Sequence, residues 1–233
     1  MANIRTFLVT GSNQGLGMHT VHQIASTPDV LVFMGSRKLA AAEEALAKFA
    51  KDVHPSSTVV PVQLDITDAA SIANAHALIV DRLQGKKLDV LINNAAIVDP
   101  SFEKTYAVNV FGAVAITEAV RPLLSDGGAI VNISSRLGSI AWHTQDPPPP
   151  IYPPYSTSKS ALNALTVNWA LQEKQKGSGI RVVSICPGYN ATNLNNYAGT
   201  MSPSDGCKII VKTALEKDGK SAAFIHQNGE YEW

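Results

Sequence analysis

The chain has 233 residues, of which 45% are hydrophobic, and it carries 19 basic and 19 acidic side chains. This composition supports one sizeable core and shows no break between regions, so we predict a single domain over residues 1–233. The balance of charge argues against nucleic acid or an anionic membrane as the main partner.

The distribution of apolar residues and cysteines indicates a protein of the cytoplasm. No apolar run approaches the roughly 18 residues of a membrane span, and the first residues lack the pattern of a secretory signal. Cys186 and Cys207 form neither a close metal-ligand pair nor a disulfide framework. Because free buried thiols suit a reducing compartment, we expect a cytoplasmic location, no membrane contact and no metal site.

Short apolar runs rich in β-branched residues recur along the chain, with helix-like stretches between them. Hydrophobic runs without alternation are typical of parallel strands that are covered on both faces. Residues 39–50 and 69–83 show helical spacing. This order predicts an α/β fold, a Rossmann-type doubly wound parallel sheet of about seven strands with helices on both faces. The predicted strands are residues 7–10, 30–34, 59–64, 90–92, 129–133, 180–185 and 222–226.

A glycine-rich turn follows the first predicted strand and precedes the first predicted helix. Glycines let the backbone turn tightly and approach a pyrophosphate, whose charge is attracted by the N–H groups and dipole of the helix N-terminus. A purely structural turn is the alternative, but the position between strand and helix favours a dinucleotide site. The residues expected to bind the cofactor here are Gly11, Ser12, Asn13, Gln14, Gly15 and Leu16.

The end of the second predicted strand indicates which dinucleotide is bound. A carboxylate at this point would accept hydrogen bonds from the ribose of NAD, but the sequence reads Gly35-Ser36-Arg37-Lys38. Since Arg pairs well with phosphate, Ser36 and Arg37 favour the 2′-phosphate of NADP(H). The alternative is that the two basic residues are solvated residues of the next helix.

A tyrosine and a lysine four residues apart are the candidate acid–base pair. Tyr155 and Lys159 open a helical segment, so their side chains share one helix face. We expect the ammonium group to lower the pKa of the phenol. Hydride addition to a carbonyl leaves negative charge on oxygen, which Tyr155 would protonate while Ser135, at the end of the fifth strand, donates a hydrogen bond.

Six motifs found in this order resemble those of the classical short-chain dehydrogenase/reductase family, and the chain is identified as a carbonyl-reductase-like member. The resemblance extends from Phe7 to about Trp233, with a cofactor half at about residues 1–135 and a catalytic and substrate half at about 136–233. The motifs are T-G-x-x-x-G-x-G at 10–17, N-N-A-A at 93–96, N-x-x-G at 109–112, I-S-S at 133–135, Y-S-T-S-K at 155–159 and P-G-Y-N-A-T at 187–192.

The resemblance implies roles for further residues. Asp65 and the backbone of Ile66 would contact the adenine, and Asn94 with Ala95 would lie beside the cofactor ribose. Asn109 would hold a water that links the catalytic lysine to solvent. Tyr155 and Lys159 would also contact the nicotinamide ribose, and Ser135 would be the catalytic serine. The nicotinamide carboxamide would be held by the segment that contains Pro187, Gly188, Asn190 and Thr192.

The sequence departs from the family pattern at several points. Ala96 stands where a glycine is usual, in a tight turn. Extra residues before Tyr155 include the Pro-rich stretch 146–154, whose four consecutive prolines cannot form a helix or a central strand, and we expect it to reshape the substrate entrance. The segment after Thr192 is short, which predicts a small or open lid. We interpret Trp142, His143, Tyr152, Tyr189 and Tyr197 as packing or surface residues.

The resulting hypothesis is an NADPH-dependent oxidoreductase that reduces a ketone, an aldehyde or an imine by hydride transfer. The same groups serve the reverse reaction, so an NADP-dependent alcohol dehydrogenase is one alternative. The other is a nucleotide-binding regulatory protein without catalysis, against which the intact set of Ser135, Tyr155, Lys159 and Asn109 argues. The expected partners are a small-molecule carbonyl or alcohol and, as in many relatives, further copies of the chain in a homodimer or homotetramer.

Overall fold

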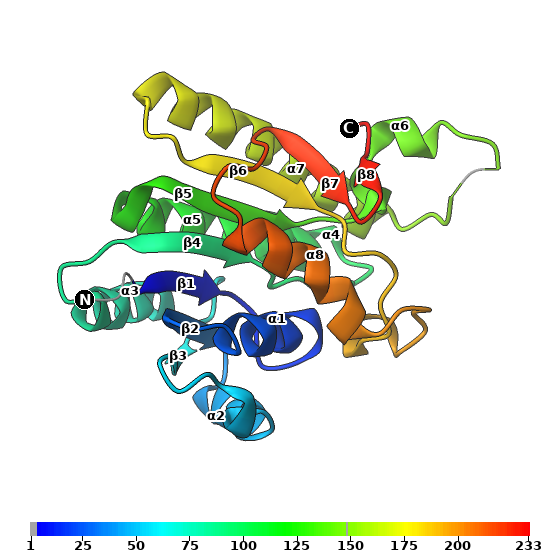
Figure 1. Cartoon of the computed structure of the whole chain (residues 1–233). Helices are drawn as coiled ribbons and strands as arrows, with labels where there is room; N and C mark the ends of the chain where they lie inside the picture. The colour runs from blue at the N-terminus through cyan, green and yellow to red at the C-terminus, as the bar shows by residue number, and fades with distance from the viewer. Residues whose placement is uncertain (1–3, 148) are drawn as a thin grey trace.

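The computed structural model describes residues 4–147 and 149–233, and its centre is one sheet of eight strands in the order β3-β2-β1-β4-β5-β6-β7-β8 (Figure 1). Neighbouring strands are parallel except for β7 and β8, which pair antiparallel. The strands are β1 Arg5–Val9, β2 Val30–Ser36, β3 Thr58–Gln63, β4 Leu88–Asn93, β5 Leu124–Ile133, β6 Arg181–Ile185, β7 Ala223–His226 and β8 Gly229–Glu230. The predicted doubly wound α/β fold is therefore confirmed, with β8 as an added short edge strand.

Helices cover both faces of this sheet because its strands are apolar on both faces. On one face, α1, α2 and α8 pack around a cluster that includes Ile24 and Ile210. On the other face, α3, α5 and α7 pack around Ile79, Ile116 and Trp169. The helices are α1 Gly15–Ala25, α2 Leu39–Ala47, α3 Ala69–Leu83, α4 Phe102–Tyr106, α5 Ala113–Val120, α6 Ile140–His143, α7 Pro153–Lys176 and α8 Pro203–Leu215. None of the described helices is long and apolar enough to cross a membrane.

Short helical turns refine the predicted boundaries. The helix predicted over residues 39–50 ends at Ala47, and a 3-10 turn follows at Ala50–Asp52. A π-helical segment at Ala107–Gly112, which the sequence pattern did not indicate, joins α4 to α5. Further 3-10 turns occupy Arg121–Leu123, Arg136–Gly138 and Asn193–Asn195.

The Pro-rich stretch 146–154 divides at the start of α7. As predicted, the described prolines of the four-proline run form neither helix nor strand, and Pro148 lies outside the described residues. Pro153 and Pro154, by contrast, occupy the first positions of α7. Prolines are tolerated there because the N–H groups of a first helical turn have no partner within the helix.

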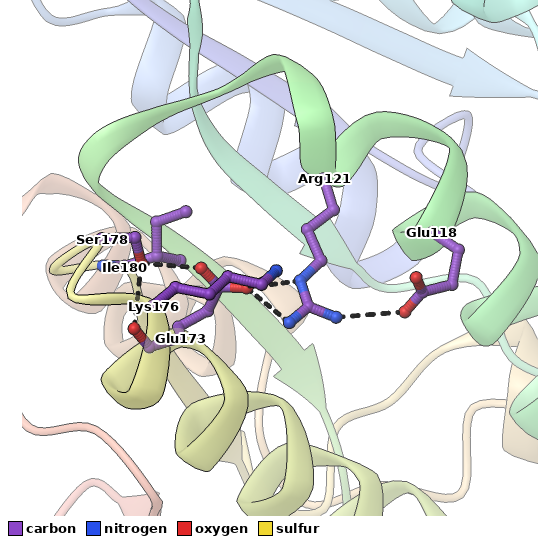
Figure 2. A network of polar contacts seen from close by, with 6 residues as sticks. All are labelled: Glu118, Arg121, Glu173, Lys176, Ser178 and Ile180. Atoms are coloured by element: carbon purple, nitrogen blue, oxygen red, sulfur yellow. Dashed lines mark hydrogen bonds and ion pairs between the residues drawn. The ribbon is translucent and has the colours of Figure 1, made fainter.

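The far end of α7 is fixed by a buried ionic network, which Figure 2 shows. Glu173, only 2% exposed, accepts hydrogen bonds from Arg121 (Nε, 2.6 Å), Lys176 (2.9 Å) and Ser178 (2.6 Å). Arg121 also pairs with Glu118 at 3.2 Å. Burial raises the pKa of the Glu173 carboxyl, but the hydrogen bonds from Ser178, Lys176 and Arg121 outweigh it and hold the pKa at about 2. The network joins the end of α5 to the end of α7.

Candidate active site

A cavity of about 590 Å³ lies at the carboxyl ends of the parallel strands, on both sides of the point between β1 and β4 where the strand order reverses. This is the edge at which doubly wound sheets bind ligands. Most of the residues predicted from the sequence line it. They are Gly11, Asn13, Gln14, Gly15, Leu16, Arg37, Asp65, Ile66, Asn94, Ala95, Ser135, Tyr155, Lys159, Pro187, Gly188, Asn190 and Thr192.

The glycine-rich turn fits a pyrophosphate. Gly11 has a φ of +59°, and a Cβ on it would lie 2.8 Å from the Cα of Ala95. A Cβ on Gly17 would lie 2.5 Å from the amide nitrogen of Asn94, so a larger residue at either position would displace the turn. Helix α1 begins at Gly15 without a side-chain hydrogen bond from Gln14, its N-cap residue. Residues of its first turn line the cavity, and the free N–H groups of a helix start can bind phosphate.

The side chain of Asn94 holds this turn against the end of β4. Its amide nitrogen donates to the carbonyl oxygens of Thr10 and Gly11, each at 2.9 Å. Ala96, which replaces the usual glycine, also lines the cavity. Its φ is not positive, so the alanine is accommodated without backbone strain.

Two of the predicted cofactor residues lie behind the cavity wall. The hydroxyl of Ser12 donates to the carbonyl oxygen of Gly35 at 3.1 Å, and Ser36 is buried with its hydroxyl 3.4 Å from the Lys38 N–H. Both side chains therefore stabilise the junction between the turn and β2. Arg37, in contrast, is exposed at the cavity, and no carboxylate in the described part of the chain pairs with it.

Tyr155, Lys159 and Ser135 meet at the other end of the cavity. Tyr155 is in the first turns of α7, and Lys159 follows one turn later on the same face, with Nζ 5.7 Å from the phenol ring centre. The Nζ of Lys159 donates to the carbonyl oxygen of Ile133 at 2.7 Å. The hydroxyl of Ser135 accepts the Leu137 N–H at 3.2 Å and shares a hydrogen bond with Tyr155.

The acid–base properties of this group differ from the sequence-based expectation. Burial raises the pKa of Tyr155 above its ordinary value, and the nearby Cys186 adds to the rise, whereas the hydrogen bond with Ser135 opposes it. The expected lowering by Lys159 does not appear; burial instead lowers the pKa of Lys159 itself to about 8. At neutral pH the phenol is therefore protonated, which suits a proton donor.

Asn109 lies outside the cavity lining, within the π-helical segment. Its side chain accepts the Ile97 N–H at 2.8 Å and donates to the Ile97 carbonyl oxygen at 3.0 Å. It also donates to the hydroxyl of Ser158, the residue before Lys159, at 3.1 Å. These contacts join the loop after β4 to α7, and the proton-relay role of Asn109 stays a prediction.

The segment after β6 closes the cavity over the start of α1. Asn190 donates to the carbonyl oxygens of Pro187 (3.0 Å) and Gly188 (2.9 Å), which fixes the turn. Thr192 faces Gly15 so closely that a Cβ there would lie 3.4 Å from the Thr192 methyl group. Asp65 uses one carboxylate oxygen to accept the N–H of Thr67 at 2.9 Å. These residues frame the same cavity from three loops.

The structure also identifies cavity residues that the sequence did not indicate. Tyr152 and Tyr189, interpreted as packing or surface residues, line the cavity and are half-exposed. The sequence signal that could have indicated their part in the cavity wall is their position, since Tyr152 lies close before Tyr155 and Tyr189 directly follows Pro187-Gly188. Trp142 and His143 are not part of the wall, and Tyr197 borders a neighbouring hollow. Further apolar wall residues include Ile97, Val98, Val108, Leu137 and Leu194.

Comparison with known proteins identifies the family. The model of the short chain dehydrogenase family matches residues 5–202. The chain belongs to this family. A short-chain dehydrogenase of Penicillium roqueforti, anuI, is 33% identical, with 91% of this chain and 89% of the relative covered. Carbonyl reductase [NADPH] 1 of Macaca fascicularis is 26% identical, with 100% and 99% covered.

A solved structure supports the same assignment for the whole fold. The NADPH-bound carbonyl reductase from chicken fatty liver superposes with a TM-score of 0.80 at 28% identity, and 100% of each chain is covered. The protein is a carbonyl-reductase-like short-chain dehydrogenase/reductase. It is an oxidoreductase of a family that binds a nicotinamide dinucleotide and acts on carbonyl or alcohol groups of small molecules.

Proposed function

We propose that the protein is an NADPH-dependent reductase of ketones or aldehydes, with imines as a related substrate group. One observation carries this proposal: a single cavity is lined by Tyr155, Ser135 and Lys159 at one end and by the glycine turn with Arg37 at the other. The first set can stabilise and protonate a carbonyl oxygen, and the second fits a phosphorylated dinucleotide.

In this proposal each catalytic side chain has a defined task. The chemistry that a reduced nicotinamide would supply when bound is a hydride for the carbonyl carbon. Ser135 donates a hydrogen bond to the oxygen on which negative charge develops, and Tyr155 donates its proton to that oxygen, which gives the alcohol. Lys159 holds a positive charge beside the phenolate that remains. The raised pKa keeps the phenol of Tyr155 protonated at neutral pH, which is the form that a proton donor needs.

The proposed preference for NADPH rests on Arg37. It is exposed at the cavity beside the buried Ser36, and residues 35–38 contain no carboxylate that would repel a 2′-phosphate. A charge-assisted hydrogen bond from a guanidinium contributes about 1.5 to 3 kcal/mol, and less when solvent reaches it.

The distribution of charged residues in the cavity wall favours a neutral substrate. The charged side chains that line it are Arg37 and Asp65 at the dinucleotide end and Lys159, which is already bonded to a backbone carbonyl. The rest of the described wall carries no charged side chain; it combines polar residues such as Ser135 with apolar and aromatic ones such as Val98 and Tyr152. A carboxylate or phosphate on the substrate would find no free cation in this part of the wall.

The test is a spectrophotometric screen for NADPH oxidation against a panel of neutral ketones, aldehydes and imines, with the alcohols and NADP⁺ as reverse arms. The proposal predicts NADPH consumption with at least one carbonyl compound, and a weaker rate with NADH. Turnover only in the alcohol arms would favour the dehydrogenase alternative. Tight NADPH binding without turnover in any arm would favour a nucleotide-binding regulatory protein.

The cellular location and the assembly are further parts of the proposal. The buried free cysteines Cys186 and Cys207 suit the reducing cytoplasm. Exposed Phe102 and Phe111 on and after α4 offer apolar surface for a homodimer or homotetramer. Imaging of a tagged chain and light scattering on a sizing column test these two statements.

A further inference from the structure

The cavity wall continues after Ser135 as a short segment that lies between α7 and the end of the chain. Residues 135–143 form the 3-10 turn Arg136–Gly138 and the four-residue helix α6. Leu137 lines the cavity, and its N–H is bonded to the hydroxyl of Ser135. A shift of this segment therefore moves both the substrate wall and the serine hydroxyl.

One side of the segment packs closely on α7. The carbonyl oxygen of Gly138 accepts hydrogen bonds from Ser160 (2.9 Å) and Asn163 (3.3 Å). A Cβ on Gly138 would lie 2.8 Å from the carbonyl carbon of Lys159, so the two backbones touch. This side is fixed by the catalytic helix itself.

The other side of the segment is held by residues 231–233, here called the strap. The hydroxyl of Ser139, which is 1% exposed, donates to the carbonyl oxygen of Glu232 at 2.6 Å. The Ala141 N–H donates to the carbonyl oxygen of Trp233 at 3.0 Å. Figure 1 shows the end of the chain beside α6, which agrees with these two bonds.

Stacked rings fix the strap to the sheet. The ring of Trp233 stacks on Phe224 of β7, with centres 5.6 Å apart and planes at 18°. Tyr231 stacks on His226 at 4.1 Å, and its N–H donates to the carbonyl oxygen of Phe224 at 2.8 Å. The strap thus transmits the rigid position of β7 to the segment after Ser135.

Arg136 adds a further connection between strap and segment. Its guanidinium lies 4.6 Å from the ring centre of Trp142, within the segment, and is close enough to the Tyr231 side chain of the strap to oppose the rise that burial causes in the pKa of that phenol. The Arg136 N–H donates to the sulfur of Cys186 at 3.2 Å, at the end of β6. Contacts with α7, with the strap and with the end of β6 therefore hold one loop at the position where the substrate wall begins.

We propose that the strap is a positioning element of the active site: Ser139 and Trp233 hold the segment 135–143 so that Leu137 and the Ser135 hydroxyl face the substrate. The proposal rests on the reductase function proposed above. It assigns the strap no contact with substrate or cofactor, and it predicts that loosening the strap impairs use of the carbonyl substrate while NADPH binding is unchanged.

The experiment compares Ser139→Ala and Trp233→Ala with the wild type on one carbonyl substrate. We expect kcat/KM for the carbonyl to fall by roughly 10- to 100-fold, as displacement of a positioned group does, with the KM for NADPH unchanged. Hydrogen exchange of the amides at 136–143 should accelerate in both variants. Trp233→Phe keeps a ring on Phe224 and should restore most of the activity.

The matched control is Ser101→Ala, which removes the hydroxyl that caps α4 but touches neither cavity nor strap. It should leave exchange at 136–143 and kcat/KM near wild type. The proposal is overturned if either strap variant keeps wild-type kcat/KM, or if exchange at 136–143 does not change. If the wild-type protein reduces no carbonyl, the proposed reductase function is contradicted. If wild type and strap variants reduce the carbonyl equally fast, the role of the strap is contradicted.

Discussion

Helix α7 buries an ionisable side chain near each of its ends, and the two side chains differ in their hydrogen-bond partners. Glu173, near the last turn, is surrounded by Arg121, Lys176 and Ser178 (Figure 2). Lys159, near the first turns, is equally buried but has only the carbonyl oxygen of Ile133 within hydrogen-bond distance in the described part of the chain.

The pKa shifts follow this difference. Partners of Glu173 favour its charged form and lower its pKa, whereas the burial of Lys159 disfavours its charged form and lowers its pKa as well. A buried charge whose partners are all in place becomes costly only when one partner is removed. A buried charge without a counter-ion costs stability and is typical of functional sites. In the proposed function, one helix thus carries a structural end and a reactive end.

Removal of the unpaired charge should give the largest effect. Lys159→Met keeps the volume of the side chain but removes the ammonium, so we expect turnover to fall by roughly 10²- to 10⁴-fold. The free energy of unfolding should rise by about 1 kcal/mol, because a buried unpaired cation is replaced by an apolar chain. Carbonyl reduction and urea unfolding measure the two quantities.

The control for this variant is Lys176→Met, a half-exposed lysine at the other end of α7. It should keep wild-type turnover. Wild-type activity should also decline as the pH rises through about 8, where Lys159 loses its charge. A Lys159→Met enzyme with an unaltered pH–rate profile would assign the lysine a structural role only.

Removal of the paired charge should have the opposite effects: stability should fall and turnover should be kept. Glu173→Gln removes the buried carboxylate beside the Arg121 guanidinium and leaves only the more exposed Glu118 as its partner; breaking a buried ion pair costs about 3 to 5 kcal/mol of unfolding free energy. Turnover measured well below the melting temperature should match the wild type. Equal stability of variant and wild type in urea would show that the network in Figure 2 contributes little.

Removal of Arg37, the exposed charge at the dinucleotide end of the cavity, should change cofactor preference by an intermediate amount. We expect Ser36→Asp with Arg37→Leu to lower kcat/KM for NADPH by roughly 10- to 150-fold relative to NADH, because the guanidinium is lost and a repelling carboxylate is added. Lys38→Leu, a neighbouring exposed cation outside the cavity lining, is the matched control. A double variant whose cofactor preference does not move would make Arg37 a solvated helix residue.

The last prediction concerns how the stability contributed by Glu173 depends on pH. The folded pKa of Glu173 is about 2, below the value of about 4.3 in an unfolded chain. Its contribution to stability is therefore complete above about pH 4.3 and is lost as the pH falls through about 2. Urea unfolding of wild type and Glu173→Gln should differ by a constant amount above this window and converge below it. A constant difference down to the lowest pH would contradict the paired-charge account.

The sequence predicts the local features of this molecule and misses the contacts that depend on distant residues. The apolar runs locate the seven parallel strands, and the spacing from Tyr155 to Lys159 places both side chains on one face of α7. The pairing of Arg121 with Glu173 joins residues 52 positions apart, and Ser139 meets Glu232 across 93 positions. No periodicity encodes such pairs, because they arise from the packing of whole elements.

The candidate site shows the same limit. Ser12 and Ser36 belong to the right loops, but the fold turns their hydroxyls away from the cavity and toward the backbone. The pKa of Tyr155 was expected to fall beside a lysine, yet burial raises it, since desolvation depends on the whole surrounding and not on one neighbour. Residue spacing therefore identifies the loops of the site, whereas burial decides the protonation of its groups.

The central claim is that the reactive end of α7 protonates a carbonyl oxygen through Tyr155. Its most direct test is the turnover of Tyr155→Phe in NADPH-dependent carbonyl reduction, measured together with NADPH affinity and urea unfolding. We predict a loss of roughly 10²- to 10⁴-fold in turnover, with NADPH affinity and stability close to wild type. A Tyr155→Phe enzyme that keeps wild-type turnover would show that Tyr155 is not the proton donor.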